Sequence, residues 1–394
     1  MSVAASPSSL TREHIDTFKR TGILVVPHLT AEELKLARGG LEQTLLKEGV
    51  DISSSDSLEA TGHQLASLSS TNGSGGVLDL FYPNWKMDIA LNERLFDMTK
   101  QLWRESYCHS GEEFDELSEA DQYKWHPFGA FDVDKGYAYI DRIGYRLPTQ
   151  MAETFGKRVA DMQQNGQVSG GNTQQKTWRR KRTRPIQRSL TPHLDCCPDT
   201  YNSSENKSKF RPIQCMVSLT DNLEANTGGF EAAAGFHHKF NDWARDRPSS
   251  VVNNARGKQS TPAPCIGEYT HIRPNEDSDV FSSIKHIPVH AGDVVFWDNR
   301  IPHSNAYKHL GTVPRSVIYC SFLPDVELNR QYVENQLKDY LSRRKPGDQW
   351  IQLSSSDEGH SGVNGGASNI EDEEQVDLSS MKELSRRLLG IDSW

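Results

Sequence analysis

His193, Asp195 and His303 are the residues whose types and spacing point most directly to a chemical function. His193 and Asp195 flank Leu194, so in an extended strand the imidazole and the carboxylate lie on one face while Leu194 points into the core. A third ligand must come from a distant segment. His303 follows a run of β-branched and aromatic residues, 292–297, that is typical of a buried strand. Two histidines and one carboxylate form the facial triad of non-haem Fe(II) oxygenases, so we predict a catalytic metal site at these three residues.

Arg315 and Asn305 are the candidate cofactor-binding residues. Arg315 lies twelve positions after His303 and begins another strand-like run, 315–322. A guanidinium fork can bind the far carboxylate of a dicarboxylic acid through two parallel hydrogen bonds, which a lysine cannot do with the same geometry. Asn305 could reach the same co-substrate or hold a metal ligand in place. The alternative for Arg315 is a surface ion pair at the end of a loop.

Four further histidines are weaker candidates for the third ligand. His286 and His290 flank a short apolar segment before the run at 292–297. His237 and His238 are adjacent, so they cannot easily serve one ion together with the triad, and we interpret them as a structural corner.

Six segments around these residues resemble, in the same order, the motifs of the phytanoyl-CoA dioxygenase-like family of Fe(II)/2-oxoglutarate oxygenases. They are 191–195, 217–222, 226–230 with 235–237, 292–297, 302–303 and 315–316. The resemblance extends with gaps from about Leu10 to Phe322. It implies an α+β fold with a mainly β core, a double-stranded β-helix of the jelly-roll or cupin-like type, buttressed by N-terminal helices. It also implies His193, Asp195 and His303 on Fe(II), and Arg315 on the C5 carboxylate of 2-oxoglutarate.

The reaction implied by this resemblance is hydroxylation of a small organic or acyl substrate, with release of succinate and CO2. A cupin-like metal enzyme that does not use 2-oxoglutarate is one alternative, and Arg315 argues against it. A nucleic-acid or chromatin-directed oxygenase, or a binding module, is the other, because residues 176–188 form a dense basic run. We interpret that run as a solvated loop that could border the pocket and favour an anionic small molecule. Substrate identity and oligomeric state stay open.

Composition narrows these choices. The chain of 394 residues has a net charge of −9 and a pI near 5.9, which argues against a surface adapted as a whole to nucleic acid or to anionic membranes. Its six cysteines form no CxxC motif, so we expect reduced thiols in an intracellular protein. Residues 1–9 show no signal pattern, no run is apolar enough to span a bilayer, and the chain does not end in a Ser-Lys-Leu signal. We expect a cytoplasmic location, and the basic run leaves the nucleus open.

We predict one catalytic domain over residues 1–350, with helices that buttress its sheet and a basic loop insertion near 163–188. A flexible acidic and Ser-Gly-rich linker is expected at 352–377, followed by a short amphipathic helix at 378–394 that docks on the domain. Near the N-terminus we expect a helix, a strand at 23–26 and a second helix that begins with a Thr30–Glu33 capping box. Residues 51–76 are predicted to be a long loop, and 86–107 a single helix.

Overall fold

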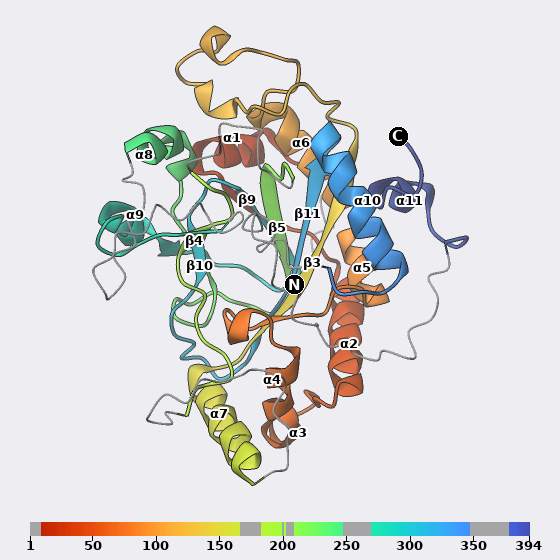
Figure 1. The fold of residues 1–394 in the computed structure, drawn as a ribbon, viewed down its shortest axis with the longest axis vertical. Coiled ribbons are helices and arrows are strands. Elements are labelled where there is room, and N and C mark those ends of the chain that lie inside the picture. Colours follow the sequence, from red (N-terminus) through yellow and green to blue (C-terminus); the bar gives the residue numbers. More distant parts are fainter. Residues whose placement is uncertain (1–8, 166–182, 199–200, 202–208, 247–268, 347–377) are drawn as a thin grey trace, which may run out of the picture.

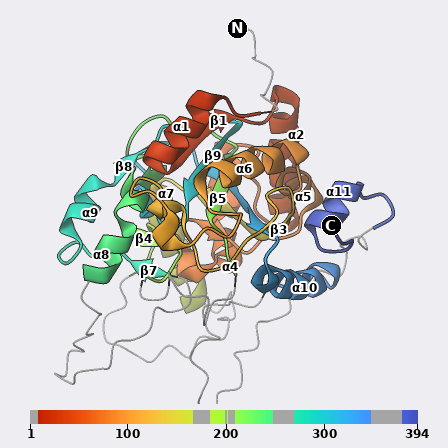
Figure 2. The same cartoon turned by 90° about the horizontal axis from the view of Figure 1, so that it is seen from above.

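Two antiparallel β-sheets form the centre of the protein, and most of the helices pack outside the larger one (Figures 1 and 2). The structure is a computed structural model that describes residues 9–165, 183–198, 201, 209–246, 269–346 and 378–394. In order across the larger sheet, the strands are β1 (Ile23–Pro27), β9 (Asp293–Asp298), β5 (Ile213–Ser218), β11 (Arg315–Pro324), β3 (Gly136–Arg146) and β2 (Val77–Leu78). Across the smaller sheet they are β7 (Thr270–His271), β4 (His193–Leu194), β10 (His303–Asn305), β6 (Phe230–Ala232) and β8 (Lys285–His286).

Alternating side chains give the larger sheet two buried faces. On β11, Val317 belongs to the inner core, which also contains Leu194 and Phe230 from the smaller sheet, whereas Ile318 belongs to the outer core, which the larger sheet shares with the helices. Successive side chains of a strand point to opposite faces, so a single strand contributes side chains to both cores. The larger sheet is therefore a middle layer, and its inner face lies against the smaller sheet.

The helical layer contains α1 (Arg12–Thr21), α2 (Ala31–Lys47), α5 (Asn84–Ala90), α6 (Glu93–Ser106) and α10 (Glu327–Leu341). The capping box that begins α2 is confirmed: Thr30 Oγ1 accepts from Glu33 N at 3.2 Å, and Glu33 Oε2 accepts from Thr30 N at 2.8 Å. The single helix expected at 86–107 is instead two helices, α5 and α6. Asn92 interrupts them because its side chain accepts from Arg94 N and caps α6.

The long loop expected at 51–76 is largely helical. It contains α3 (Ser55–Thr61), η1 (Gly62–Gln64), α4 (Leu65–Leu68) and η2 (Thr71–Gly73). Ser54 caps α3 by accepting from Ser57 N at 3.0 Å, and Leu58 and Leu65 are buried in the outer core. Two well-placed leucines and a cap were enough to order a segment whose composition is typical of a loop. The helix α7 (Thr149–Gln164) follows β3 and lies beside this helical segment, where Arg158 donates to the Ala60 carbonyl at 3.1 Å (Figure 1).

The remaining helices include η3 (Phe114–Glu116) and η4 (Gln122–Lys124) before β3, and η5 (Phe236–His238), α8 (Phe240–Asp246) and α9 (Ser278–Ser283) near the smaller sheet. The C-terminal helix α11 (Glu383–Leu388) packs on the main body. Leu388 and Leu389 are buried in the outer core, and Trp394 Nε1 donates to the Gly136 carbonyl at 2.8 Å. The linker predicted at 352–377 and most of the basic run lie outside the described residues.

One expectation about the cysteines is wrong. Cys197 is disulfide-bonded, whereas Cys108, Cys215 and Cys320 are free, buried thiols. Spacing along the chain could not reveal this, because disulfide formation depends on the approach of two Cβ atoms in space. In the described part of the chain, no helix combines the length and apolar character needed to cross a membrane.

Candidate metal centre

Pairing of two short strands brings the candidate ligands together. β10 pairs with β4 in antiparallel fashion, with His303 directly opposite His193, and Asp195 follows β4. His193 Nε2 lies 3.6 Å from Asp195 Oδ1, and His303 Nε2 lies 3.7 Å from Asp195 Oδ2. One ligand atom from each residue lies within 4.8 Å of the others, a separation that suits a shared metal ion. Within the described residues this is the cluster of three such side chains that could hold a metal.

Both histidines are oriented by backbone carbonyls. His193 Nδ1 lies 2.8 Å from the Thr191 carbonyl oxygen, and His303 Nδ1 lies 2.9 Å from the Ile301 carbonyl oxygen. A carbonyl oxygen only accepts, so Nδ1 is the donor in each ring and Nε2 is the nitrogen that can bind a metal. Each Nε2 faces Asp195. The sequence repeats the arrangement, since the carbonyl comes from the second residue before each histidine.

The charge states of the cluster also suit a cation. Burial and, to a smaller extent, the neighbouring His193 together lower the pKa of His303 to about 4, so this imidazole is neutral at pH 7. Burial by itself would raise the pKa of Asp195, but His193, His303 and Arg211 together hold it below its usual range. The cluster therefore offers a carboxylate and a neutral imidazole, the protonation states that bind metal.

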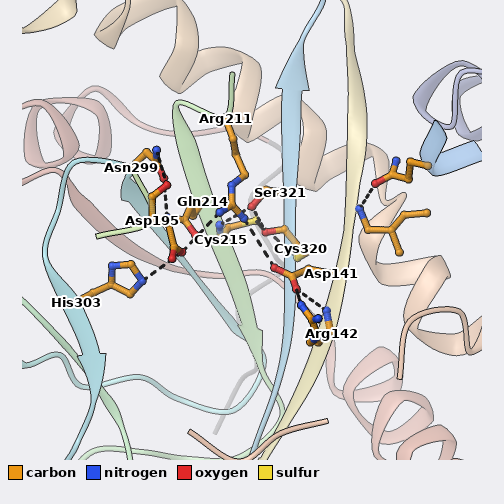
Figure 3. A network of polar contacts seen from close by, with 12 residues as sticks. Asp141, Arg142, Asp195, Arg211, Gln214, Cys215, Asn299, His303, Cys320 and Ser321 are labelled. Atoms are coloured by element: carbon orange, nitrogen blue, oxygen red, sulfur yellow. Dashed lines mark hydrogen bonds and ion pairs between the residues drawn. The ribbon is translucent and has the colours of Figure 1, made fainter. Parts of the chain in front are cut away.

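A polar network supports Asp195 from the side away from His303 (Figure 3). Arg211 Nη2 lies 3.6 Å from Asp195 Oδ2, and Arg211 Nη1 lies 3.8 Å from Asp141 Oδ2. Asn299 Nδ2 donates to the Asp195 carbonyl at 3.3 Å and is itself held by Gln214, whose side-chain amide donates to Asn299 Oδ1 at 2.8 Å. These contacts restrain both the backbone and the side chain of Asp195.

The position of Asp141 in that network results from a β-bulge. Along the pairing of β3 with β11, Ile143 lies opposite Ile318 and Ile140 lies opposite Cys320. Two residues of β3, 141 and 142, therefore face the single residue Tyr319. Such an extra residue bends a strand and turns a side chain away from its regular direction, and here it carries Asp141 toward Arg211.

Aromatic rings enclose the cluster. Tyr269 stacks on His193 with centroids 4.7 Å apart and an interplanar angle of 20°. Trp297 and Phe230 lie 5.2 Å and 5.9 Å from the His303 ring. These rings remove the imidazoles from bulk water on the sides that face the inner core, which strengthens electrostatic interactions at the site.

Arg315 and Asn305, the predicted cofactor-binding residues, are both buried and in contact. Arg315 Nη1 donates to Asn305 Oδ1 at 3.3 Å, and Arg315 Nη2 lies 3.2 Å from Met216 Sδ. The surface ion pair considered for Arg315 is excluded within the described residues, because its side chain is only 2% exposed and has no carboxylate partner there. Asn305 follows His303 on β10, so it connects the arginine to the metal cluster.

The rival histidines lie outside the cluster. His290 is exposed and lies 3.6 Å from Asp221, and His286 pairs with Glu231 along the edge of the smaller sheet. His237 and His238 both lie within hydrogen-bonding distance of the Lys19 carbonyl, at 3.0 and 2.8 Å. These last two residues fasten α1 to the segment after β6.

Sequence reasoning did not find Arg211, Asn299 or Tyr269. Arg211 and Tyr269 stand next to segments outside the described residues, and neither belongs to a local motif. Asn299 carried a usable signal, because it is a polar residue directly after a strand that precedes a candidate ligand. What joins the three is proximity to His193 and Asp195 in space.

The fold and the cluster define a two-sheet antiparallel protein with a buried His-Asp-His site. The family to which it belongs is shown by a family model described as Gig2-like, which matches residues 120–382, well over half of the chain. The chain therefore belongs to the Gig2-like family. The match covers all three residues of the cluster and Arg315.

Solved structures agree with this assignment. GIG2 (DUF1479) from Candida albicans aligns with a TM-score of 0.62 at 15% identity, covering 99% of this chain and 78% of that one. The hypothetical protein JW0805 from Escherichia coli aligns with a TM-score of 0.57 at 15% identity, covering 97% and 82%. At such identities the likeness establishes a shared fold only. A comparison with curated proteins finds no match.

The expected membership of the phytanoyl-CoA dioxygenase-like family is wrong. The Gig2-like match overturns it. The six segments that carried the resemblance are short and surround the cluster and its strands, so they describe a kind of site and do not separate families that place similar residues on similar strands. SnoK, a non-heme alpha ketoglutarate dependent carbocyclase from nogalamycin biosynthesis, aligns with a TM-score of 0.42 at 14% identity, covering 88% and 96%. A likeness of that strength carries no conclusion.

Proposed function

We propose that this protein is a non-haem Fe(II) oxygenase that uses 2-oxoglutarate as co-substrate and hydroxylates a small organic molecule. The observation that carries the proposal is the cluster of His193, Asp195 and His303, in which both Nε2 atoms face the carboxylate. Two imidazoles and one carboxylate are the donor set of the facial triad, which leaves open positions for co-substrate and oxygen. Closed structural zinc sites instead use four protein ligands, often cysteines.

The order of the strands supports a double-stranded β-helix as the finer description of the fold. Along the chain, β3, β5, β9 and β11 belong to the larger sheet, and β4, β6, β8 and β10 belong to the smaller one. The strands lie in the order β9-β5-β11-β3 in the first sheet and β4-β10-β6-β8 in the second. Such repeated crossing between two antiparallel sheets is the jelly-roll arrangement.

In this mechanism His193, Asp195 and His303 would hold the metal, and the Thr191 and Ile301 carbonyls fix the two rings. Arg315 anchors the far carboxylate of 2-oxoglutarate through its fork, and Asn305 holds one arm of that fork in place. When bound, Fe(II) and 2-oxoglutarate would supply the reduction of O2, in which one oxygen atom enters succinate as CO2 is released and the other is inserted into a C–H bond of the substrate.

The rest of the site positions groups and excludes water. Asn299 and Arg211 restrain Asp195, so the carboxylate keeps its direction when the metal arrives. Tyr269, Trp297 and Phe230 cover the imidazoles. A dry, fixed site lowers the reorganisation needed during the reaction.

Anaerobic titration of the full chain with Fe(II) and 2-oxoglutarate tests this function. We expect the weak visible charge-transfer band of an iron-bound 2-oxo acid in the wild type, and its loss in His303→Ala and Arg315→Ala. His290→Ala is the matched control, because this exposed histidine lies outside the cluster, and its band should be unchanged. Iron binding without a band would refute the use of 2-oxoglutarate and favour a cupin-like metal enzyme. No iron binding would refute the oxygenase and leave a binding module.

A further inference from the structure

Two buried arginines lie side by side at one end of the larger sheet. Arg315 at the start of β11 is directly opposite Arg146 at the end of β3. Opposite residues of an antiparallel pair point to the same face, with Cβ atoms about 5 Å apart. Arg315 points to the inner face, where it contacts Asn305 and Met216. Both arginines are 2% exposed.

Neither guanidinium has a carboxylate partner in the described part of the chain. Arg146 Nη1 donates to the Arg188 carbonyl at 2.7 Å, and the Nε atoms of Arg146 and Arg315 are buried with no hydrogen bond there. Arg300 is a useful contrast, because it is equally buried but donates to Asp298 at 2.8 and 2.7 Å. Burial and, to a smaller extent, the neighbouring Arg315 together lower the pKa of Arg146 to about 10.

The surroundings of the pair are built closely around it. Gly228, with φ +76°, packs so tightly that a Cβ there would meet His309 at 2.8 Å and Arg146 at 3.1 Å. Gly75, with φ +67°, would bring a Cβ within 2.8 Å of Asn305 Nδ2. His309 lies near both arginines, and its pKa is lowered to about 4, chiefly by burial, so it is neutral at pH 7. Glycine backbone thus packs against the Arg146 stem and against Asn305, and it adds no negative side chain.

Two adjacent buried cations with open donors are costly unless an anion neutralises them, since each loses its hydration and repels the other. Such a pair fits a ligand with a localised negative charge and several acceptor lone pairs, such as a carboxylate. The pair is also connected to the metal cluster, because Asn305 bonds to Arg315 and follows His303 by two residues on β10.

We propose that Arg146 and Arg315 together bind the far carboxylate of 2-oxoglutarate and make the site specific for a dicarboxylic 2-oxo acid over a monocarboxylic one. This inference rests on the proposed function and adds Arg146 as a second binding residue. Arg146 also fastens residues 186–188 beside β3 through the Arg188 carbonyl. A purely structural role would disturb binding of all 2-oxo acids alike, whereas the proposed role affects only those with a second carboxylate.

The test uses the full chain with Mn(II) as a redox-inert metal and measures binding of 2-oxoglutarate and of 2-oxobutyrate by calorimetry. We expect Arg146→Gln to weaken 2-oxoglutarate about tenfold to a hundredfold, the loss of one or two charge-assisted hydrogen bonds, while 2-oxobutyrate and Mn(II) bind as in the wild type. Arg146→Lys keeps the positive charge but loses the guanidinium fork, so its affinity for 2-oxoglutarate should lie between those of the wild type and Arg146→Gln. Arg94→Gln is the control, since Arg94 pairs with Glu33 at 2.7 Å in the helical layer.

The outcomes separate this inference from the proposed function. If Arg146→Gln weakens both acids equally or neither, Arg146 is structural and the inference falls, although Arg315 can still support the function. Glutarate, which has two carboxylates but no 2-oxo group, tests the arginine pair without the metal. If the wild type binds glutarate, Arg146→Gln does not, and no 2-oxo acid binds at the metal, then the two-arginine pocket is supported and the proposed function fails. A wild type that binds none of these acids overturns both.

Discussion

Replacing Arg300 with Met should destabilise the protein severely, because it leaves Asp298 charged in the core without its cationic partner. The two side chains are each 1% exposed and meet through Nε to Oδ1 at 2.8 Å and Nη2 to Oδ2 at 2.7 Å. Asp298 also accepts from the Tyr107 hydroxyl, and Arg300 also donates to the Tyr123 carbonyl. Burial would raise the pKa of Asp298, yet Arg300 holds it at about 2.

The magnitude follows from two routes. Breaking a buried ion pair from one side costs about 3–5 kcal/mol. Independently, a carboxyl pKa lowered from about 3.9 to about 2 corresponds to roughly 2.6 kcal/mol of stabilisation at neutral pH. We therefore expect Arg300→Met to lower the free energy of unfolding by about 3–5 kcal/mol. The double variant Asp298→Asn with Arg300→Met should recover part of that loss, since no uncompensated charge remains.

Urea unfolding monitored by tryptophan fluorescence measures the change in the free energy of unfolding, and Arg146→Met is the matched control. Arg146 is just as buried but has no carboxylate partner within the described residues, so without added ligand its replacement should cost far less than that of Arg300. The reasoning is refuted if Arg300→Met costs less than about 1 kcal/mol, or if both variants lose the same free energy. Because Arg300 lies between β9 and β10, a confirmed loss would also explain how the loop before His303 is held.

Further predictions concern pH, the metal, a glycine and the C-terminus. Burial lowers the folded-state pKa of His28 to about 4, below an unfolded value near 6.5. The stability that neutral His28 contributes is therefore complete above pH 6.5 and is lost as the pH falls toward 4, by up to about 1.4 kcal/mol per pH unit. Over that range the urea midpoint should fall less steeply in His28→Gln than in the wild type, and equal slopes would contradict this. Mn(II) at a hundred times its dissociation constant should stabilise the wild type by about 2.7 kcal/mol but not His303→Ala, and a similar rise in melting temperature in both would place the metal elsewhere. Gly228→Ala should lower the free energy of chemical unfolding by about 1–2 kcal/mol or more, because φ is +76° and the added Cβ would crowd His309. An unchanged free energy would mean that the loop relaxes to admit the Cβ. Trp394→Ala should lower the free energy of unfolding by about 1–3 kcal/mol and expose α11 to protease, because it removes the hydrogen bond to the Gly136 carbonyl and the ring contact with Phe96. Unchanged cleavage would show that Leu388 and Leu389 are enough to hold α11 on the domain.

Local signals in the sequence were reliable where one segment carried the whole argument. The Thr30–Glu33 capping box formed as expected, because capping needs only four consecutive residues. Strand-like runs at 292–297 and 315–322 correspond closely to β9 and β11, because β-branched and aromatic residues suit a sheet buried on both faces. Local composition misled where it was the only guide, as at 51–76, since buried leucines and a serine cap ordered helices there.

The sequence by itself determined which residue types were available for the cluster and that His193 and Asp195 share one side of an extended segment. Only the tertiary structure decided the rest, because strand register joins residues that are distant in the chain. It set His303 opposite His193, placed Arg211 against Asp195, and brought Arg146 beside Arg315 with no carboxylate paired to either in the described residues. The burial of these side chains and the charges that surround them depend on this arrangement in space, so they could not be predicted from spacing along the chain.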